Sequence, residues 1–343
     1  MGENKLKSAI IGCGQIAGGY DEYAEDDQIR THAKAYQQQP ATELVAVADR
    51  DYRRAKEFSA HWGVPETYAD AAKMLSTVKP DIVSICTPDN THAEMLQLCL
   101  ECRGIKAVWC EKPLMTEIKN AGAIVSGYTQ KGVVLSVNYW LRWDAEIQRI
   151  KSALQKGELG NIQKVVVYYT KGICHNGSHA VDLLLDWFGL PGEMQVFGSR
   201  VDLTDDDPTV DARLLVGDIP VYLIGADARE YSIFEIDVLG TLGRVNIEVS
   251  GRETRWFQRQ PDQLFKGYQV LRLSPQNNSS FKLDASSAMA GALQEIIGAI
   301  STGKPVRSNG HTALATLSVC CELAGQAKKL MNDKQRLMKI QLR

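Results

Sequence analysis

The sequence lacks an excess of either charge. Its 343 residues include 39 Lys and Arg against 41 Asp and Glu, which gives a formal net charge of −2. A basic field is what gives a protein general attraction for nucleic acid or for an anionic membrane surface. Neither is therefore expected as a partner of this chain.

Long apolar runs are also missing. No stretch approaches the ~20 consecutive apolar residues that a membrane-spanning helix needs, and the segment Met1 to Lys5 has no apolar signal core. Eight cysteines are present, but most fall inside apolar strand-like or helix-like runs of a chain too long to need disulfide staples. We therefore predict a reduced protein that stays in the cytoplasm.

The length predicts more than one domain. A chain of 343 residues exceeds the usual size of a single hydrophobic core. Its composition, 44% hydrophobic and 23% charged, is that of an ordinary globular protein. We expect one domain over residues 1–136 and a second over residues 137–343.

The first domain alternates short apolar runs with helical patterns, and most of the apolar runs have no polar alternation. Such runs are typical of strands buried on both faces of a parallel sheet. The strands are expected at Lys7 to Ile11, Glu43 to Ala48, Ile82 to Cys86, Ala107 to Cys110 and Val133 to Val137. The helices between them are expected at Thr31 to Gln39, Tyr52 to His61, Asp70 to Ser76, Thr91 to Arg103 and Thr116 to Gln130. This order predicts an α/β fold with a doubly wound parallel sheet.

A glycine-rich turn lies between the first strand and the first expected helix. It reads Gly12-Cys13-Gly14-Gln15-Ile16-Ala17. Glycines at the first and third places allow a tight turn and let backbone N–H groups approach a pyrophosphate. We therefore expect Gly12, Gly14, Gln15, Ile16 and Ala17 to bind a dinucleotide.

The second strand ends in Asp49, whose carboxylate is suited to the ribose hydroxyls of the cofactor. Its unusual distance from the glycines is explained by an acidic insertion over Gly18 to Asp27, which is either a solvated loop or a flap over a ligand. Asp49 would repel a 2′-phosphate, whereas Arg50 beside it would pair with one. NAD is favoured as the cofactor, and NADP stays possible.

Another turn is expected at the carboxyl edge of the sheet, where open α/β sheets bind ligands. It reads Thr87-Pro88-Asp89-Asn90-Thr91-His92. Thr87 and Pro88 are expected beside the cofactor. His92 has two interpretations, a contact to the cofactor or a hydrogen bond to local backbone.

The second domain is predicted to be α+β, with a large, mainly antiparallel open sheet. Strands are expected at Gln163 to Thr170, Glu193 to Val201, Ala212 to Val216, Val221 to Gly225, Ser232 to Leu239 and Arg244 to Ile247, with helices at Ala180 to Phe188, Met289 to Ser301 and Thr312 to Leu342. Polar alternation over Phe234 to Val238 indicates that one sheet face meets solvent or another subunit. A homodimer or homotetramer would cover such a face. The run Asp205-Asp206-Asp207-Pro208 is expected to form a solvated turn.

Two segments carry most of the predicted chemistry. One is Glu111-Lys112-Pro113, at the end of an apolar strand, and the other is Gly177-Ser178-His179-Ala180-Val181-Asp182. With the Gly12 to Ala17 turn, Thr87-Pro88 with His92, Asn138 to Arg142, Gly157 to Gly160 and Gly240 to Gly243, they cover nearly the whole length. On these motifs the chain resembles the glucose–fructose oxidoreductase, inositol dehydrogenase and MocA family of NAD(P)-dependent sugar oxidoreductases.

The resemblance implies roles for individual residues. It assigns Lys112 to the catalytic centre, next to the cofactor with Glu111. It assigns His179 to acid/base work on the substrate hydroxyl or carbonyl, and Asp182 to orienting that histidine or touching substrate. Relatives commonly carry an aspartate four residues before the catalytic histidine, and here that position is His175. The missing negative charge implies a less basic Lys112–His179 pair and a shifted pH optimum.

Alcohol oxidation explains why these residue types suit the site. A histidine, with an ordinary pKa of about 6.5, accepts or donates a proton near neutral pH. A lysine stabilises a developing alkoxide. If the helix begins early enough, His175 and His179 share one face. That arrangement also fits a metal, but we expect none. His175 is then either catalytic or a hydrogen-bonding residue.

Substrate contacts are expected from a second group of residues near these motifs. Tyr139 and Arg142 lie in an aromatic stretch at the predicted domain junction, suited to stacking on a sugar and to meeting an anionic group. The alternative for this stretch is interdomain packing. Asn176, beside His175, is also expected to bind substrate.

Three functions follow as hypotheses. The leading one is an NAD(P)-dependent dehydrogenase or reductase acting on a ring hydroxyl or keto group of a sugar, cyclitol or nucleotide-linked sugar. The second is a relative that uses tightly held NAD without net redox change, as a glycoside hydrolase, lyase or epimerase. The third is a non-catalytic cofactor-binding sensor, which intact Lys112 and His179 disfavour.

Overall fold

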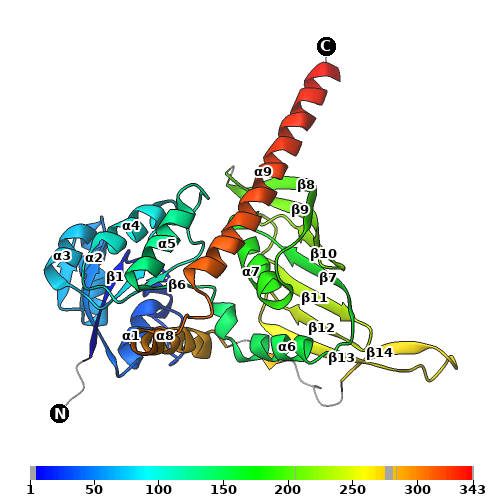
Figure 1. The fold of residues 1–343 in the computed structure, drawn as a ribbon, viewed down its shortest axis with the longest axis horizontal. Coiled ribbons are helices and arrows are strands. Elements are labelled where there is room, and N and C mark those ends of the chain that lie inside the picture. Colours follow the sequence, from blue (N-terminus) through cyan, green and yellow to red (C-terminus); the bar gives the residue numbers. More distant parts are fainter. Residues whose placement is uncertain (1–4, 205, 275–280, 283, 342–343) are drawn as a thin grey trace. The chain divides into compact units, whose positions relative to one another are not determined.

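The protein folds as two compact units (Figure 1). The structure is a computed structural model that describes residues 5–204, 206–274, 281–282 and 284–341. The first unit runs to Asp144 and resumes over Asp284–Leu317. The second holds the intervening segment from Ala145 and the described chain from Ser318 onward. Our sequence boundary made a single cut between residues 136 and 137, whereas the first unit here consists of two separate segments.

The first unit is built on a parallel sheet, as the sequence predicted. Within the described residues it has six strands in the order β3-β2-β1-β4-β5-β6. They are β1 (Leu6–Ile11), β2 (Thr42–Ala48), β3 (Glu66–Tyr68), β4 (Ile82–Ile85), β5 (Ala107–Cys110) and β6 (Val134–Val137). This is the doubly wound order in which ligands bind beyond the carboxyl ends of the strands. The short, partly exposed β3 was not predicted.

Helices connect these strands. They are α1 (His32–Gln38), α2 (Tyr52–Trp62), α3 (Ala71–Val78), α4 (His92–Glu101) and α5 (Ala121–Lys131), with single 3₁₀ turns at Gly19–Asp21, Asp89–Thr91 and Trp140–Trp143. Asp51 and Asp70 cap α2 and α3 by accepting backbone N–H groups of the first turn. The predicted start of α5 at Thr116 is wrong. The chain stays irregular until Asn120, whose φ of 67° is left-handed, and α5 begins only after it.

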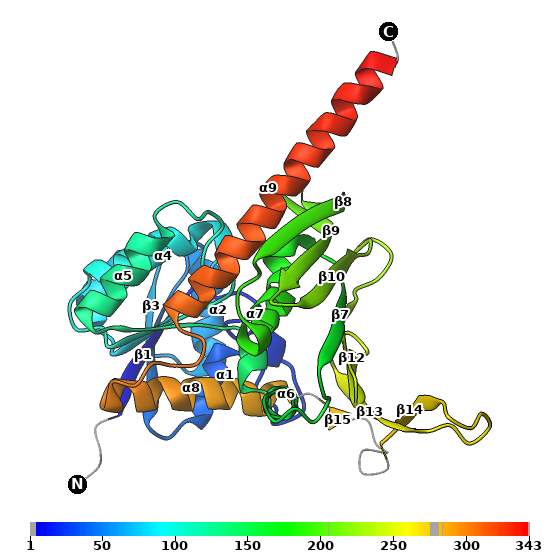
Figure 2. The same cartoon turned by 45° about the vertical axis from the view of Figure 1, so that its right-hand side comes forward.

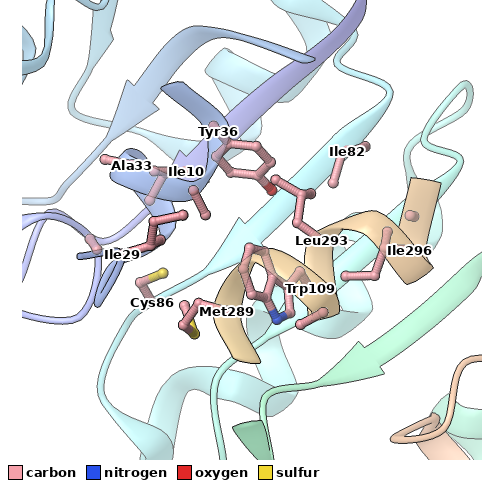
Figure 3. Packing of buried hydrophobic residues seen from close by; sticks show 14 of the residues in the cluster. Ile10, Ile29, Ala33, Tyr36, Ile82, Cys86, Trp109, Met289, Leu293 and Ile296 are labelled. Carbon is pink, nitrogen blue, oxygen red and sulfur yellow. The ribbon is translucent and has the colours of Figure 1, made fainter. Parts of the chain in front are cut away.

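The helix α8 (Ala285–Thr302) belongs to the first unit, although its sequence position placed it in the second predicted domain. Its apolar stripe includes Met289, Leu293 and Ile296, which join the core around Tyr36 and Trp109 (Figure 3). Burying one such aliphatic side chain stabilises a fold by about 1.5–3 kcal/mol. In Figure 2, α8 runs beside α1. This apolar face explains why the chain returns to the first unit.

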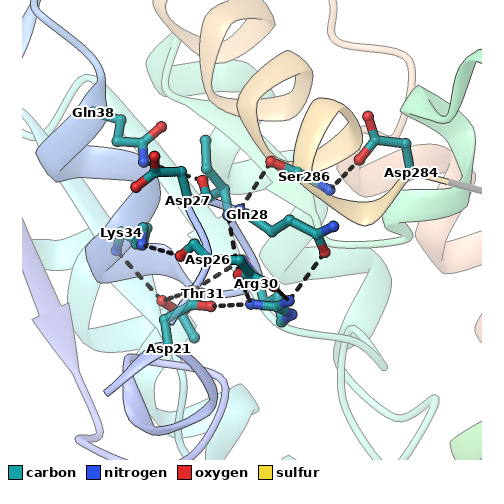
Figure 4. Close-up of polar contacts among 11 residues, drawn as sticks. Asp21, Asp26, Asp27, Gln28, Arg30, Thr31, Lys34, Gln38, Asp284 and Ser286 are labelled. Carbon is teal, nitrogen blue, oxygen red and sulfur yellow. Dashed lines mark hydrogen bonds and ion pairs between the residues drawn. The ribbon is translucent and has the colours of Figure 1, made fainter. Parts of the chain in front are cut away.

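The acidic insertion after the glycine turn is anchored to α1 (Figure 4). The Asp21 carboxylate is buried and accepts hydrogen bonds from the Arg30 backbone N–H at 2.9 Å and the Thr31 hydroxyl at 2.8 Å. The Arg30 guanidinium reaches both Asp21, at 3.2 Å, and Asp26, at 2.6 Å. The Ile29 N–H donates to the Ser286 hydroxyl on α8. Asp21 therefore ties the insertion to the start of α1, which neither sequence interpretation of the loop anticipated.

Replacing Asp21 with alanine should destabilise the first unit by about 2–4 kcal/mol, because it leaves buried donors of Arg30 and Thr31 without their acceptor. Urea unfolding of the variant measures the loss. Glu25→Ala is the matched control, since Glu25 is an exposed acid of the same insertion. Equal stability of the two variants would show that the Asp21 contacts do not hold the loop.

The second unit is built on a large, mainly antiparallel sheet, also as predicted. The described residues give nine strands, ordered β14-β13-β12-β11-β7-β10-β9-β8 with β15 beside β13, and the β7–β10 pair is parallel. They are β7 (Ile162–Tyr169), β8 (Glu193–Thr204), β9 (Asp207–Val216), β10 (Ile219–Gly225), β11 (Phe234–Gly240), β12 (Gly243–Glu248), β13 (Glu253–Pro261), β14 (Gln269–Leu273) and β15 (Phe281–Lys282). The hairpin of β13 and β14 projects from the sheet (Figure 2). It was not predicted.

The described residues form three further α-helices: α6 (Ala145–Gln155), α7 (Gly177–Phe188) and α9 (Gly310–Gln341). The sequence predicted α7 and α9 but missed α6. Strands β9 to β12 alternate buried and half-buried residues, as expected of a sheet with one covered face. No described helix is long and apolar enough to cross a membrane.

Candidate functional site

In the glycine turn, Gly12 packs closely against the backbone after β4, whereas Gly14 borders open space. Gly12 has a φ of 92°, and a Cβ there would lie 2.7 Å from the Cys86 carbonyl oxygen at the end of β4. A Cβ on Gly14 would meet nothing within 4 Å. Gly12 is therefore required by the fold. Gly14 leaves exposed backbone and room for a ligand such as a pyrophosphate.

The turn does not open an α-helix directly, and the first α-helix begins only after the inserted residues, as the sequence predicted. The Gly18 and Gly19 N–H groups both donate to the Gly14 carbonyl at 3.3 Å, and Tyr20 donates to Gln15. The inserted residues then delay the first α-helix to His32. Ile16 and Ala17 accept the N–H groups of the first residues of α1 through their backbone carbonyls, so the turn is fixed against the helix that follows the insertion.

Asp49 has a structural role that the sequence did not reveal, as an acceptor of backbone hydrogen bonds. One carboxylate oxygen accepts the Cys13 N–H at 2.9 Å and the other accepts the Asp51 N–H at 2.8 Å, while the Arg54 guanidinium lies 3.7 Å away. Asp49 is buried and Arg50 is exposed. The carboxylate thus joins the end of β2 to the glycine turn.

His92 connects two turns at the carboxyl edge. Its Nδ1 lies 2.7 Å from the Pro113 carbonyl oxygen and its Nε2 lies 3.0 Å from the Thr87 carbonyl oxygen. The ring is 1% exposed. Thr87 also accepts a hydrogen bond from the Thr91 hydroxyl at 2.8 Å. Both ring nitrogens of His92 therefore lie against backbone carbonyls, one nearby in sequence and one after β5, and the turns after β4 and β5 are held together.

Glu111 lies at the end of β5 in a dense polar environment. Its Oε1 accepts hydrogen bonds from His32 Nε2 at 3.0 Å and Asn138 Nδ2 at 2.6 Å, and its Oε2 accepts the Lys112 N–H at 3.2 Å. Burial alone raises the pKa of the Glu111 carboxyl. The hydrogen bonds from His32 and Asn138 and the charge of Lys112 outweigh burial and leave this pKa below its ordinary value. Sequence reasoning missed His32, because nothing in its local pattern links it to Glu111, 79 positions away.

The aromatic stretch after β6 is largely buried. Tyr139 is 1% exposed and Arg142 is 3% exposed. The Arg142 guanidinium donates to the Arg307 carbonyl at 3.0 Å. The Trp143 indole donates to Glu295 on α8. The contacts of this stretch to the α8 region lie inside the first unit.

The histidines lie in the second unit, at a tight turn that leads into α7. Residues Gly172–Asn176 form one π-helical turn, and Asp207 accepts the N–H groups of Cys174 and His175, both at 2.8 Å. A Cβ on Gly172 would lie within 2.1 Å of an Asp207 carboxylate oxygen. Burial raises the pKa of Asp207. The predicted solvated turn is therefore wrong for Asp207, which begins β9 and holds the histidine turn; residue 205 lies outside the described residues.

His179 is in the first turn of α7, and its ring packs edge-on against Phe234 at a centroid distance of 6.3 Å. Asp182 lies on the same helix and is 1% exposed. His175 precedes the α-helix, which begins at Gly177 after Asn176 at the N-cap. The π-helical turn that holds His175 runs directly into the α-helix that holds His179, and a shared face for the two histidines stays a prediction.

The cysteines and histidines bear on two further kinds of site, disulfide bonds and a metal centre. All eight cysteines are free thiols. Among the described residues, no group of three His, Cys, Asp or Glu side chains is arranged to hold a metal ion.

Comparison with known proteins gives consistent findings. A family model described as an oxidoreductase family with an NAD-binding Rossmann fold matches residues 6–139. D-apiose dehydrogenase of Paraburkholderia graminis is 31% identical over 46% of this chain and 38% of its own length. D-glucoside 3-dehydrogenase of Escherichia coli is 29% identical over 66% of this chain and 56% of its own. The matched region thus spans about two fifths to just over half of these relatives.

Other proteins are similar over nearly the full length at lower identity. Inositol 2-dehydrogenase of Rhizobium meliloti is 22% identical over 97% of this chain and 98% of its own. A solved 3-ketoreductase from Actinomadura kijaniata, in complex with NADP and TDP-benzene, matches with a TM-score of 0.74 at 18% identity, covering 94% and 98% of the two chains. A UDP-N-acetylglucosamine 3-dehydrogenase from Acidithiobacillus ferrooxidans gives 0.73 at 17%, covering 95% and 99%. These structures show a shared fold.

Proposed function

We propose, from the match of residues 6–139 to the oxidoreductase family with an NAD-binding Rossmann fold, that this chain belongs to that family and is an NAD(P)-dependent dehydrogenase or reductase. The reaction moves a hydride between the nicotinamide and a ring hydroxyl or keto group of a sugar, cyclitol or nucleotide-linked sugar.

One observation carries this proposal. Four neighbouring strands, β1, β4, β5 and β6, place the glycine turn, Thr87, Lys112 and Asn138 in succession along the carboxyl edge of one sheet. That edge is where dinucleotides bind in this strand order. Polar contacts through Asp49, His92 and Glu111 hold the turns of this edge. The names of the relatives, which act on apiose, glucosides and inositol, support a polyhydroxylated substrate.

The chain's residues fit a dinucleotide. The open space at Gly14 suits a pyrophosphate, with the turn Gln15 to Ala17 around it. An ionised carboxylate has about four acceptor positions, and the contacts of Asp49 leave capacity for a ribose hydroxyl. Arg50 is exposed beside it, which keeps NADP possible while Asp49 favours NAD. Thr87, Pro88, His92 and Glu111 complete the proposed cofactor edge.

The proposed chemistry depends mainly on His179 and Lys112. When bound, the nicotinamide supplies the hydride acceptor or donor. His179 would take the hydroxyl proton during oxidation and return it during reduction, with His175 assisting. Lys112 would stabilise the negative charge that develops on the substrate oxygen. Asp182, Asn176, Tyr139 and Arg142 are proposed to bind or orient substrate.

The proposal extends to assembly and location. The strands and hairpin turns of the second unit expose large hydrophobic side chains, among them Tyr168, Phe197, Leu242, Phe265 and Tyr268. A homodimer or homotetramer would cover apolar surface of this kind. Eight free thiols fit a reducing cytoplasm.

Incubating the purified protein with NAD⁺ or NADP⁺ and a panel of sugars, cyclitols and nucleotide-linked sugars should produce the absorbance of reduced nicotinamide with one substrate class. Cofactor retained through purification, with sugar turnover but no net absorbance change, would instead identify a redox-neutral enzyme. Tight cofactor binding without any turnover would identify a sensor.

A further inference from the structure

A continuous line of buried hydrogen bonds leads from α1 to Glu111. The Tyr36 hydroxyl lies 2.7 Å from Ser84 Oγ, Ser84 Oγ lies 2.9 Å from His32 Nδ1, and His32 Nε2 lies 3.0 Å from Glu111 Oε1. Tyr36 and His32 are one helical turn apart, Ser84 is on β4 and Glu111 follows β5. Tyr36, Ser84 and His32 are at most 1% exposed.

Counting hydrogens gives this line a direction. The ionised Glu111 only accepts, so His32 Nε2 must carry a hydrogen. If His32 Nδ1 is bare, the Ser84 hydroxyl donates to it and the Tyr36 hydroxyl donates to Ser84. Protonating Nδ1 would reverse the Ser84 bond and leave a buried hydroxyl hydrogen of Tyr36 or Ser84 without an acceptor among the described contacts. The neutral Nε2–H form of His32 satisfies every group.

We propose that His32 is a positioning residue for Lys112: Tyr36 and Ser84 fix its tautomer, and its Nε2–H fixes the Glu111 carboxylate that receives the Lys112 backbone N–H. The catalytic part of this inference rests on the function proposed above. His32 itself is fully buried, so we assign it no direct contact with substrate or cofactor.

The geometry explains how an effect at His32 reaches Lys112. Glu111 Oε1 is held between His32 and Asn138, so Oε2 is fixed toward the Lys112 N–H. Losing the His32 donor removes one of the two hydrogen bonds to Oε1, and one of the three described for the carboxylate. The negative charge of Glu111, which lies next to Lys112, then loses its fixed position.

The same contacts make the position of the Glu111 carboxylate sensitive to pH. The titratable groups around Glu111 are His32, Lys112 and the thiols of Cys86 and Cys110, whose pKa values are raised well above the ordinary thiol value mainly by burial. The pKa of Glu111 is lowered in the folded protein, so its contribution to stability is present at neutral pH and is lost as the pH falls through the lowered value. Removing a hydrogen-bond donor moves that loss to higher pH.

His32→Leu and His32→Gln separate positioning from packing. Leucine fills space beside Trp109, whose ring centroid is 3.9 Å from that of His32, but it donates nothing. Glutamine places an amide N–H near the position of Nε2. We expect His32→Leu to lower kcat/KM by about tenfold to a hundredfold and to move the acidic limb of the pH profile to higher pH. His32→Gln should recover most of both losses.

Two NMR measurements test the proposal without turnover. In protein labelled with ¹⁵N-histidine, the His32 signals, assigned by their loss in His32→Gln, should report the Nε2–H tautomer at neutral pH. The Lys112 Cε signal, assigned with Lys112→Met, should move in His32→Leu and return toward its wild-type position in His32→Gln.

Each result bears on one claim. An Nδ1–H tautomer, or a Lys112 signal equally unaffected by both substitutions, would overturn the proposal. Equal losses of activity in both variants with an unshifted pH limb would reduce His32 to a packing role and also overturn it. Absence of turnover in the wild-type protein would count against the proposed function alone, because the NMR signals still decide the positioning claim.

Discussion

Replacing Lys112 with methionine should lower turnover by about a hundredfold to a thousandfold while NADH still binds with nearly wild-type affinity. Methionine keeps the unbranched stem but loses the ammonium that we propose stabilises the substrate oxygen, and a lost electrostatic donor of this kind costs a rate of that order. The contact between Glu111 and residue 112 uses the backbone N–H, so the turn should survive. Single-turnover absorbance measures the rate, and fluorescence titration measures NADH binding.

Lys106→Met is the matched control. Lys106 directly precedes the same strand, at its amino end, and its ammonium pairs with Asp81 at 2.9 Å. That pair is half exposed, so its loss should cost little stability and leave turnover unchanged. If Lys112→Met turned over as fast as Lys106→Met, Lys112 would have no part in the chemistry.

Substituting the two glycines of the turn should separate folding from cofactor binding. Gly12→Ala places an L-residue at a φ of 92° with its Cβ 2.7 Å from a backbone carbonyl oxygen. Left-handed strain and overpacking together should cost about 2–5 kcal/mol of stability. Gly14→Ala meets nothing within 4 Å, so its stability should stay within about 0.5 kcal/mol of wild type.

For NADH binding we expect Gly14→Ala, not Gly12→Ala, to be the informative substitution. Gly14→Ala should weaken NADH binding by more than about tenfold in a fully folded protein, because the added methyl group occupies the space proposed for the pyrophosphate. Urea unfolding and NADH titration on both variants measure the two effects. Unchanged NADH affinity in Gly14→Ala would move the pyrophosphate away from this turn.

Much of the first unit could be predicted because its strands are apolar on both faces. Runs such as Ile82 to Cys86 and Ala107 to Cys110 have no competing helical interpretation at that length. The three-residue β3 has no such run, since its side chains are partly exposed. The first helix was predicted at Thr31 to Gln39, after the insertion, and lies at His32–Gln38. The contacts by which Asp21 anchors that insertion could not be predicted from the sequence.

The site was predictable only where its residues carry a local pattern. Lys112 and His179 stand in recognisable motifs, and their roles remain predictions. The contact of His32 with Glu111 depends on the pairing of strands and on the direction of α1, neither of which a single sequence reveals. The same is true of Asp207, whose neighbours in sequence suggested a solvated turn but whose carboxylate caps backbone amides 32 and 33 positions earlier.

The return of α8 has a consequence for synthesis of the protein. A ribosome releases Asp144 about 140 residues before Asp284, where the missing helix begins. At about 5–20 residues per second, this interval lasts roughly seven to thirty seconds. During that time the apolar surface that α8 will cover, around Tyr36 and Trp109, has no permanent partner. The first unit therefore cannot complete its core until α8 has been made, although its first strand is made first, and we expect its nascent form to expose apolar surface during that interval.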